Sequence, residues 1–120
     1  MNIRGIIGAP WAVPCDPPSS FDCWELVRHV RAMIGLRTPS VVDKDRRRPS
    51  DRKQFGQPPM GWNQLSEPVE GCVARIGSAH VGVYLNGGDV IHAQLATGVR
   101  IDKVEFLSFP VSFWEFEQCR

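Results

Sequence analysis

The sequence predicts an α+β domain in which an N-terminal helix packs on a C-terminal antiparallel sheet. The first half contains one clear amphipathic helical pattern, and the second half contains short β-favouring runs broken by Gly, Asn and Ser. With 120 residues and 42% apolar content, the chain can support one compact core. We therefore expect a single domain over residues 1–120.

The helix is predicted to begin just after residues 10–20, "PWAVPCDPPSS", whose four prolines favour an extended or turning segment. Asp22 has the side chain of an N-cap, and Glu25 follows three residues later as in a capping box. Cys23 falls at the first helical position, and Gly35 offers an end to the helix. The apolar face with the helical period comprises Cys23, Leu26, Val27, Val30, Met33 and Ile34.

The segment from about 38 to 62, rich in Pro, Arg, Asp and Gly, has no apolar period and predicts a long surface loop. Its middle, residues 43–53, has six basic and three acidic residues. These charges fit a solvated loop or a surface that docks an anionic partner. Met60 and Trp62 are candidates for packing back on the domain.

The second half predicts a meandering antiparallel sheet, because each of its runs favours strands and ends at turn-forming residues. The runs are "GCVARI", "HVGVYL", "DVIHAQL", "GVRIDKV" and "VSFWEF".

Composition excludes several classes of function. The net charge of +1 and the pI near 7.7 do not favour nucleic acid as a specific ligand. The apolar run at the start is too short for a signal peptide, and no segment is long enough to span a membrane. We therefore expect synthesis in a cytoplasm without membrane insertion, which leaves a virion component possible.

The four cysteines show no Cys-x-x-Cys spacing, so neither a disulfide framework nor a zinc knuckle is expected. Cys15, Cys23, His80 and His92 could still supply four metal ligands, which keeps a metal site open as an alternative. Considered alone, Cys23 is also compatible with a small buried apolar side chain.

Two of the three histidines lie on the less apolar faces of predicted strands. His80 shares its face with Gly82 and Tyr84, and His92 shares its face with Val90 and Gln94. A two-residue turn at residues 87–88 would point the histidines to opposite faces, whereas an odd-numbered loop would put them on the same face. His29, the third, faces away from Cys23 on the helix.

Cys23, His80 and His92 could together form a nucleophilic site. The first turn of a helix favours a thiolate, because its N–H groups and dipole are positive. His80 could take the thiol proton and return it to a leaving amine, and His92 could orient His80. The backbone N–H of Cys23 could stabilise an oxyanion.

The ordered motifs "GAPW", "FDCWELVR" and "HVGVYLNGGDVIHA", from about Ile6 to Ala93, resemble the NlpC-type family of papain-like cysteine peptidases. The resemblance is to the branch found in bacteriophage tails as tail-assembly or tail-tip proteins. It implies Cys23 as nucleophile, His80 as general base and acid, and His92 as the orienting residue. We expect Trp11, Asp22, Trp24 and Tyr84 in the substrate-binding part of the site.

The resemblance further implies a peptidase that cleaves stem peptides of bacterial peptidoglycan and needs no metal or other cofactor. Its partners would be these peptides and other tail-tip proteins. Its location would be the virion, and it would act at the cell wall during DNA entry or function in tail assembly. The alternative is a structural tail-tip subunit that keeps the peptidase fold without cleaving.

Overall fold

The computed structural model describes residues 3–38, 62–77 and 80–116. Within them the fold is α+β, as predicted, with one α-helix and one sheet. Most of the predicted loop, including Met60 and its charged middle, lies outside the described residues. The elements are α1 (Cys23–Met33), β1 (Trp62–Leu65), β2 (Val73–Ile76), β3 (His80–Tyr84), β4 (Asp89–Gln94), β5 (Gly98–Lys103), β6 (Val111–Phe116) and three short 3-10 helices, η1 (Ile3–Ile6), η2 (Asn86–Gly88) and η3 (Val104–Phe106).

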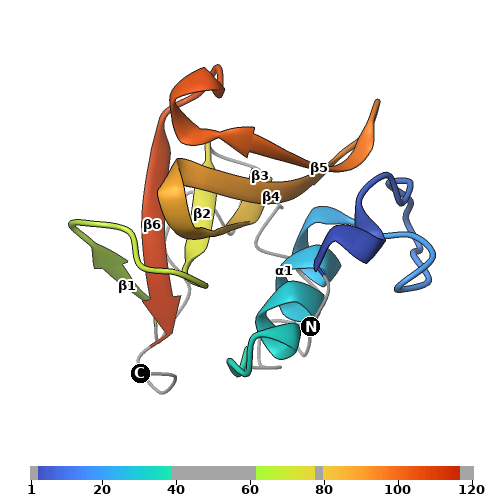
Figure 1. Ribbon diagram of the computed structural model, residues 1–120, viewed down its shortest axis with the longest axis horizontal. Coiled ribbons are helices and arrows are strands. Elements are labelled where there is room, and N and C mark those ends of the chain that lie inside the picture. The colour runs from blue at the N-terminus through green and yellow to red at the C-terminus, as the bar shows by residue number, and fades with distance from the viewer. Residues whose placement is uncertain (1–2, 39–61, 78–79, 117–120) are drawn as a thin grey trace.

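The strands pair antiparallel in the order β1-β6-β2-β3-β4-β5. The prediction of a meander is confirmed for β2 to β5, which pair consecutively. β6 instead returns to pair with β2, and β1, which the sequence did not predict, adds an edge beyond β6. The helix α1 packs against β3 and β4 (Figure 1).

The predicted ends of α1 are confirmed. The Asp22 carboxylate accepts a hydrogen bond of 2.7 Å from the backbone N–H of Glu25, which satisfies a donor of the first turn. At the other end Gly35 has a φ of +84°, and the N–H of Leu36 donates to the carbonyl of Arg31 at 2.8 Å. A glycine is favoured there because other residues rarely adopt a positive φ.

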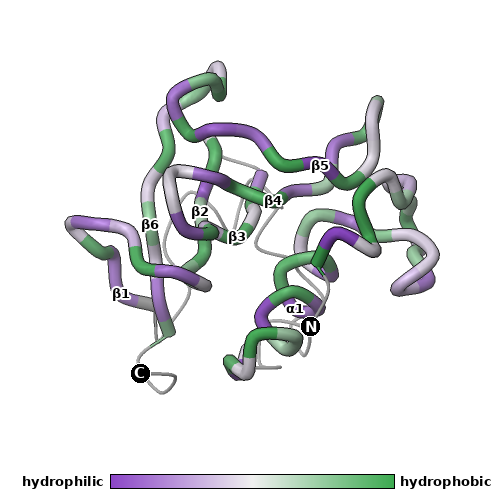
Figure 2. The backbone as a smooth tube through the Cα atoms, viewed as in Figure 1, coloured by the Kyte–Doolittle hydropathy of each residue, from purple (hydrophilic) through white to green (hydrophobic). Residues whose placement is uncertain are grey.

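The main core lies between α1 and the sheet. Hydrophobic residues recur along α1 and on the strands with hydrophilic residues between them (Figure 2). Leu26, Val27 and Val30 are fully buried, whereas Met33 and Ile34 are only partly buried. On the sheet, the residues of the same hydrophobic cluster include Val73, Val81, Val83, Ile91 and Ala93. A smaller cluster around Ala74, Ile76 and Val90 covers the opposite face of the sheet.

The N-terminal segment is tied to the start of β5. The N–H of Gly8 donates to the carbonyl of Val99 at 2.8 Å, and the N–H of Val99 donates to the carbonyl of Ala9 at 2.9 Å. Gly98 permits this approach, because a Cβ at that position would lie 2.4 Å from the Ala9 oxygen.

A buried ion pair joins α1 to β6. Arg31 is fully buried, and its Nη2 lies 2.8 Å from Oε2 of Glu115, which is also buried. The sequence did not reveal this pair, although Arg31 follows the inward-facing Val27 by four residues. The other partners of the guanidinium are the carbonyls of Arg37 and Gly71, the hydroxyl of Thr38 and the ring of Phe116.

Replacing one member of this pair should destabilise the fold strongly. Arg31→Met leaves the Glu115 carboxylate buried without its cation, which typically costs about 3–5 kcal/mol. Chemical denaturation should show this loss in the free energy of unfolding. The double variant Arg31→Met/Glu115→Leu should recover part of it, because both charges are then absent. A single variant as stable as the wild type would contradict this account.

Candidate active site

His80 and His92 meet on one face of the sheet. The register pairs Gly82 with His92, and the N–H of Leu85 donates to the carbonyl of Asp89 at 2.7 Å, which closes a loop of three residues. Of the two turn geometries considered, the odd-numbered loop is therefore the one observed. His80 lies diagonally across from His92, and its Nε2 is 2.9 Å from Nδ1 of His92.

Gly82 makes room for this contact. A Cβ at residue 82 would lie 2.6 Å from the carbonyl oxygen of Ile91 and 2.9 Å from Cβ of His92. Real Cβ atoms do not approach so closely, so a side chain here would push β4 away. The group that approaches residue 82 closely is therefore His92 itself.

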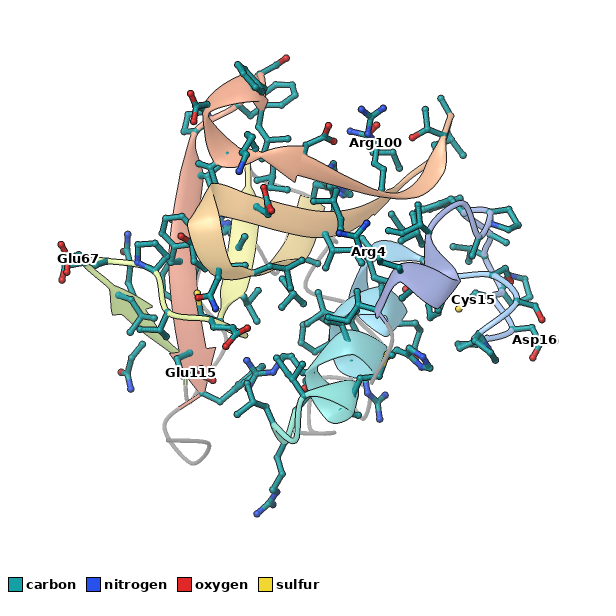
Figure 3. All side chains as sticks on the ribbon, in the orientation of Figure 1. Arg4, Cys15, Asp16, Glu67, Arg100 and Glu115 are labelled. Atoms are coloured by element: carbon teal, nitrogen blue, oxygen red, sulfur yellow. The ribbon has the colours of Figure 1, made fainter. Side chains whose placement is uncertain are left out.

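His92 also contacts the carboxylate of Asp102, which the sequence did not reveal as part of the site. Nε2 of His92 lies 2.8 Å from Oδ2 of Asp102, and Arg100 bonds both oxygens of the same carboxylate through Nε and Nη2, each at 2.8 Å. Arg100 projects from β5 on the side away from α1 (Figure 3). Alternation along "VRIDK" places Arg100 and Asp102 on one face, but the register with β4 was needed to place that face over His92.

Burial keeps the histidines uncharged at neutral pH. Burial and, to a smaller extent, the nearby His92 together lower the pKa of His80 from 6.5 to about 4. Burial likewise lowers the pKa of His92, although Asp102 partly opposes the shift. For Asp102 burial raises the pKa, but hydrogen bonds from His92 and Arg100 outweigh it and hold the pKa below its ordinary value. At pH 7 the site therefore holds two neutral imidazoles and one carboxylate.

Cys23 is the first residue of α1, as predicted. It is present as a thiol, and the residue is only 6% exposed. The preceding residue, Asp22, is buried and caps the helix. Trp11 lies beside the segment that leads into Cys23, because it forms a parallel bridge with Phe21 and is partly exposed. The N–H of Phe21 donates to the carbonyl of Pro10 at 3.0 Å.

Two other residues expected to bind substrate contact the protein itself. Trp24, which was expected in the substrate-binding part of the site, is 0% exposed and packs edge-on against Phe116 at 6.3 Å between ring centroids, so it lies in the core. The Tyr84 hydroxyl accepts a hydrogen bond of 3.1 Å from the N–H of Gly88, and its ring packs on Phe113. Tyr84 therefore supports the turn between β3 and β4.

His29 is partly buried and packs its ring edge-on against Phe21, with 5.2 Å between the ring centroids. Cys15 lies on the loop beside α1 (Figure 3), and it and Cys72 are present as thiols. No group of three or more His, Cys, Asp or Glu side chains in the described ranges could hold a metal ion. No helix within those ranges is both long enough and apolar enough to cross a membrane.

The lowered pKa values of the two histidines should make stability depend on pH. Between pH 6.5 and about 4 the unfolded chain protonates at residue 80 and the folded protein does not, so stability falls as the pH falls through this range. The lowered pKa values of His92 and Asp102 change stability in the same direction. Denaturant midpoints at pH 7 and pH 4.5 should differ less for His80→Gln than for the wild type. Equal differences would contradict the burial of a neutral His80.

Gly82→Ala tests the packing of β3 on β4. The added methyl group overpacks the contact with β4, which typically costs about 1–3 kcal/mol of stability. It should also separate His80 from His92, and loss of cross-peaks between the two rings in NMR spectra would show this. An alanine variant with unchanged stability and an intact contact would rule out the close approach.

Comparison with known proteins agrees with this architecture. The sequence profile of the NlpC/P60 family matches residues 8–115. A search of curated proteins finds no significant match.

Solved structures share the fold. The NlpC/p60 domain of the peptidoglycan hydrolase SagA superposes with a TM-score of 0.60 at 23% identity, covering 92% of this chain and 90% of that one. NlpC2 and NlpC1 from Trichomonas vaginalis each superpose with a TM-score of 0.67, at 18% and 17% identity. This chain matches over 95% of its length in both cases, and it spans 44% and 41% of those chains.

The family profile thus covers α1, β1 to β5 and nearly all of β6, including the cysteine that begins α1 and the histidines of β3 and β4. The chain therefore belongs to the NlpC/P60 family.

Proposed function

We propose that residues 1–120 form a single cysteine peptidase domain that hydrolyses stem peptides of peptidoglycan. Cys23 is the nucleophile, His80 the general base and acid, and His92 the residue that orients His80. The observation that carries the proposal is the contact of 2.9 Å between two neutral imidazoles, the partly buried His80 on β3 and the fully buried His92 on β4. These are the strands against which α1 packs, and α1 begins at Cys23.

The first half of the reaction forms an acyl-enzyme. His80 takes the proton of the Cys23 thiol, and the thiolate attacks the carbonyl carbon of the scissile peptide bond. The N–H of Cys23, in the first turn of α1, helps stabilise the oxyanion of the tetrahedral intermediate. When the C–N bond breaks, His80 returns the proton to the leaving amine.

Water then completes the cycle. His80 takes a proton from a water molecule, which attacks the thioester carbonyl, and the thiolate leaves and is reprotonated. His92 keeps the His80 ring in place through both halves. Trp11 fits a substrate contact, because it is partly exposed beside the segment that leads into Cys23. The proposed chemistry needs no metal.

The proposed setting is a bacteriophage or prophage tail tip, where the domain opens the cell wall locally during DNA entry or acts in tail assembly. The resemblance of "FDCWELVR" and "HVGVYLNGGDVIHA" to the phage branch of the family supports this setting. The partners would then be stem peptides and neighbouring tail-tip proteins in the virion. Finding the chain by mass spectrometry in purified phage particles would test the location.

Cys23→Ala should abolish release of stem-peptide fragments from purified peptidoglycan while the fold remains intact, because the nucleophile is absent. Mass spectrometry of the soluble products measures the release, and circular dichroism checks the fold. Cys15→Ala is the matched control: it removes a partly exposed thiol outside α1 and should leave release unchanged.

Two outcomes separate the peptidase from a structural subunit with the same fold. Fragment release that persists in Cys23→Ala would show that Cys23 is not the nucleophile. A wild-type protein that releases nothing, and whose Cys23 reacts with alkylating reagents only at the high pH of an ordinary thiol, would favour the structural subunit.

A further inference from the structure

We propose that Asp102 is a positioning residue that fixes the direction of every hydrogen bond in the histidine pair, so that Nδ1 of His80 is the atom that accepts the Cys23 proton. This inference rests on the proposed peptidase function. It adds Asp102 as a fourth residue of the proposed site, and it names Nδ1 of His80 as the atom that acts as the base.

Asp102 sets the direction of the hydrogen bonds, because it is the last group in the series His80, His92 and Asp102. An ionised carboxylate can only accept, so the bond of 2.8 Å between His92 and Asp102 requires a proton on Nε2 of His92. A neutral imidazole has one N–H, and its other nitrogen carries a lone pair. Nδ1 of His92 is therefore an acceptor.

The same reasoning then applies to His80. Its Nε2 lies 2.9 Å from Nδ1 of His92, and because Nδ1 accepts, Nε2 of His80 must donate. The single proton of neutral His80 is thus on Nε2, and the lone pair is on Nδ1. The base is available before substrate arrives, and no ring has to exchange a proton first.

Arg100 keeps the carboxylate in this role. It donates to both oxygens of Asp102 at 2.8 Å, which fixes the plane of the carboxylate and favours its ionised form. A guanidinium has no acceptor, so Arg100 cannot reverse any bond in the chain. The Arg100 side chain is 46% exposed, whereas that of His92 is fully buried. The charge pair therefore lies between the histidines and solvent.

Proton transfer needs no rearrangement in this arrangement. When Nδ1 of His80 takes the thiol proton, Nε2 continues to donate to His92, and His92 continues to donate to Asp102. The positive charge on His80 faces a chain of acceptors that ends in a carboxylate. With the bonds reversed, Nδ1 of His80 would already carry a proton and could not act as a base.

The first test reads the tautomers directly and does not depend on activity. In Cys23→Ala protein labelled with ¹⁵N-histidine, two-bond N–H correlation spectra at pH 7 should show His80 and His92 both protonated on Nε2. Asp102→Ala in the same background should populate the form of His92 protonated on Nδ1. Either histidine protonated on Nδ1 while Asp102 is present would overturn the inference.

The second test measures hydrolysis of a soluble stem peptide. Asp102→Asn keeps the shape of the side chain but loses its charge and its obligate acceptor character. Its kcat should fall by about 10²-fold or more, within the range of general acid–base effects, with little change in KM. Asp89→Asn is the matched control, because Asp89 pairs with Lys103 across the same two strands at 2.9 Å, away from the histidines.

The outcomes separate this inference from the function on which it rests. If Cys23→Ala abolishes hydrolysis but Asp102→Asn is as active as Asp89→Asn, the role of Asp102 is wrong and the peptidase stands. If hydrolysis survives in Cys23→Ala, the peptidase assignment is wrong, and the tautomer spectra still decide the hydrogen-bond direction. A loss in Asp102→Asn that appears in KM alone would also count against a positioning role.

Discussion

The pairing of β3 with β4 is the constraint on which the candidate site depends. Its register puts Gly82 against His92, and only a glycine allows the two strands to come as close as they do. That closeness brings the diagonal neighbour His80 to His92, and the next pairing, β4 with β5, brings Asp102 to the other nitrogen of the same ring. Three chemical groups are thus aligned by backbone hydrogen bonds rather than by flexible loops.

Burial and polarity act together along this line of side chains. A lone buried histidine simply loses its charge, and a lone buried carboxylate is costly. Here both ring nitrogens of His92 and both carboxylate oxygens of Asp102 have partners, and the carboxylate lies beside the cation of Arg100. The desolvation that makes the imidazoles neutral therefore does not leave an unpaired charge inside the protein.

Local sequence patterns predicted the helix and the strands, because both depend on neighbouring residues. The cap at Asp22, the end near Gly35 and the strands β2 to β6 follow from period and turn chemistry alone. The register between β3 and β4 did not, since "YLNGGD" suits turns of either parity. Arg31 and Asp102 were missed for a related reason: each owes its role to a partner brought near by the fold, and a charged residue in a sequence does not disclose that partner.

The ties between the N-terminal segment and β5 have a consequence for the order of folding. Residues 8–9 form backbone hydrogen bonds with Val99, which lies far along the chain from them. Contacts between residues so far apart form late in folding, because a long loop must close first. The segment that contains Trp11 and leads into Cys23 is therefore anchored late. If the chain is a peptidase, its site is completed only in the last stage of folding.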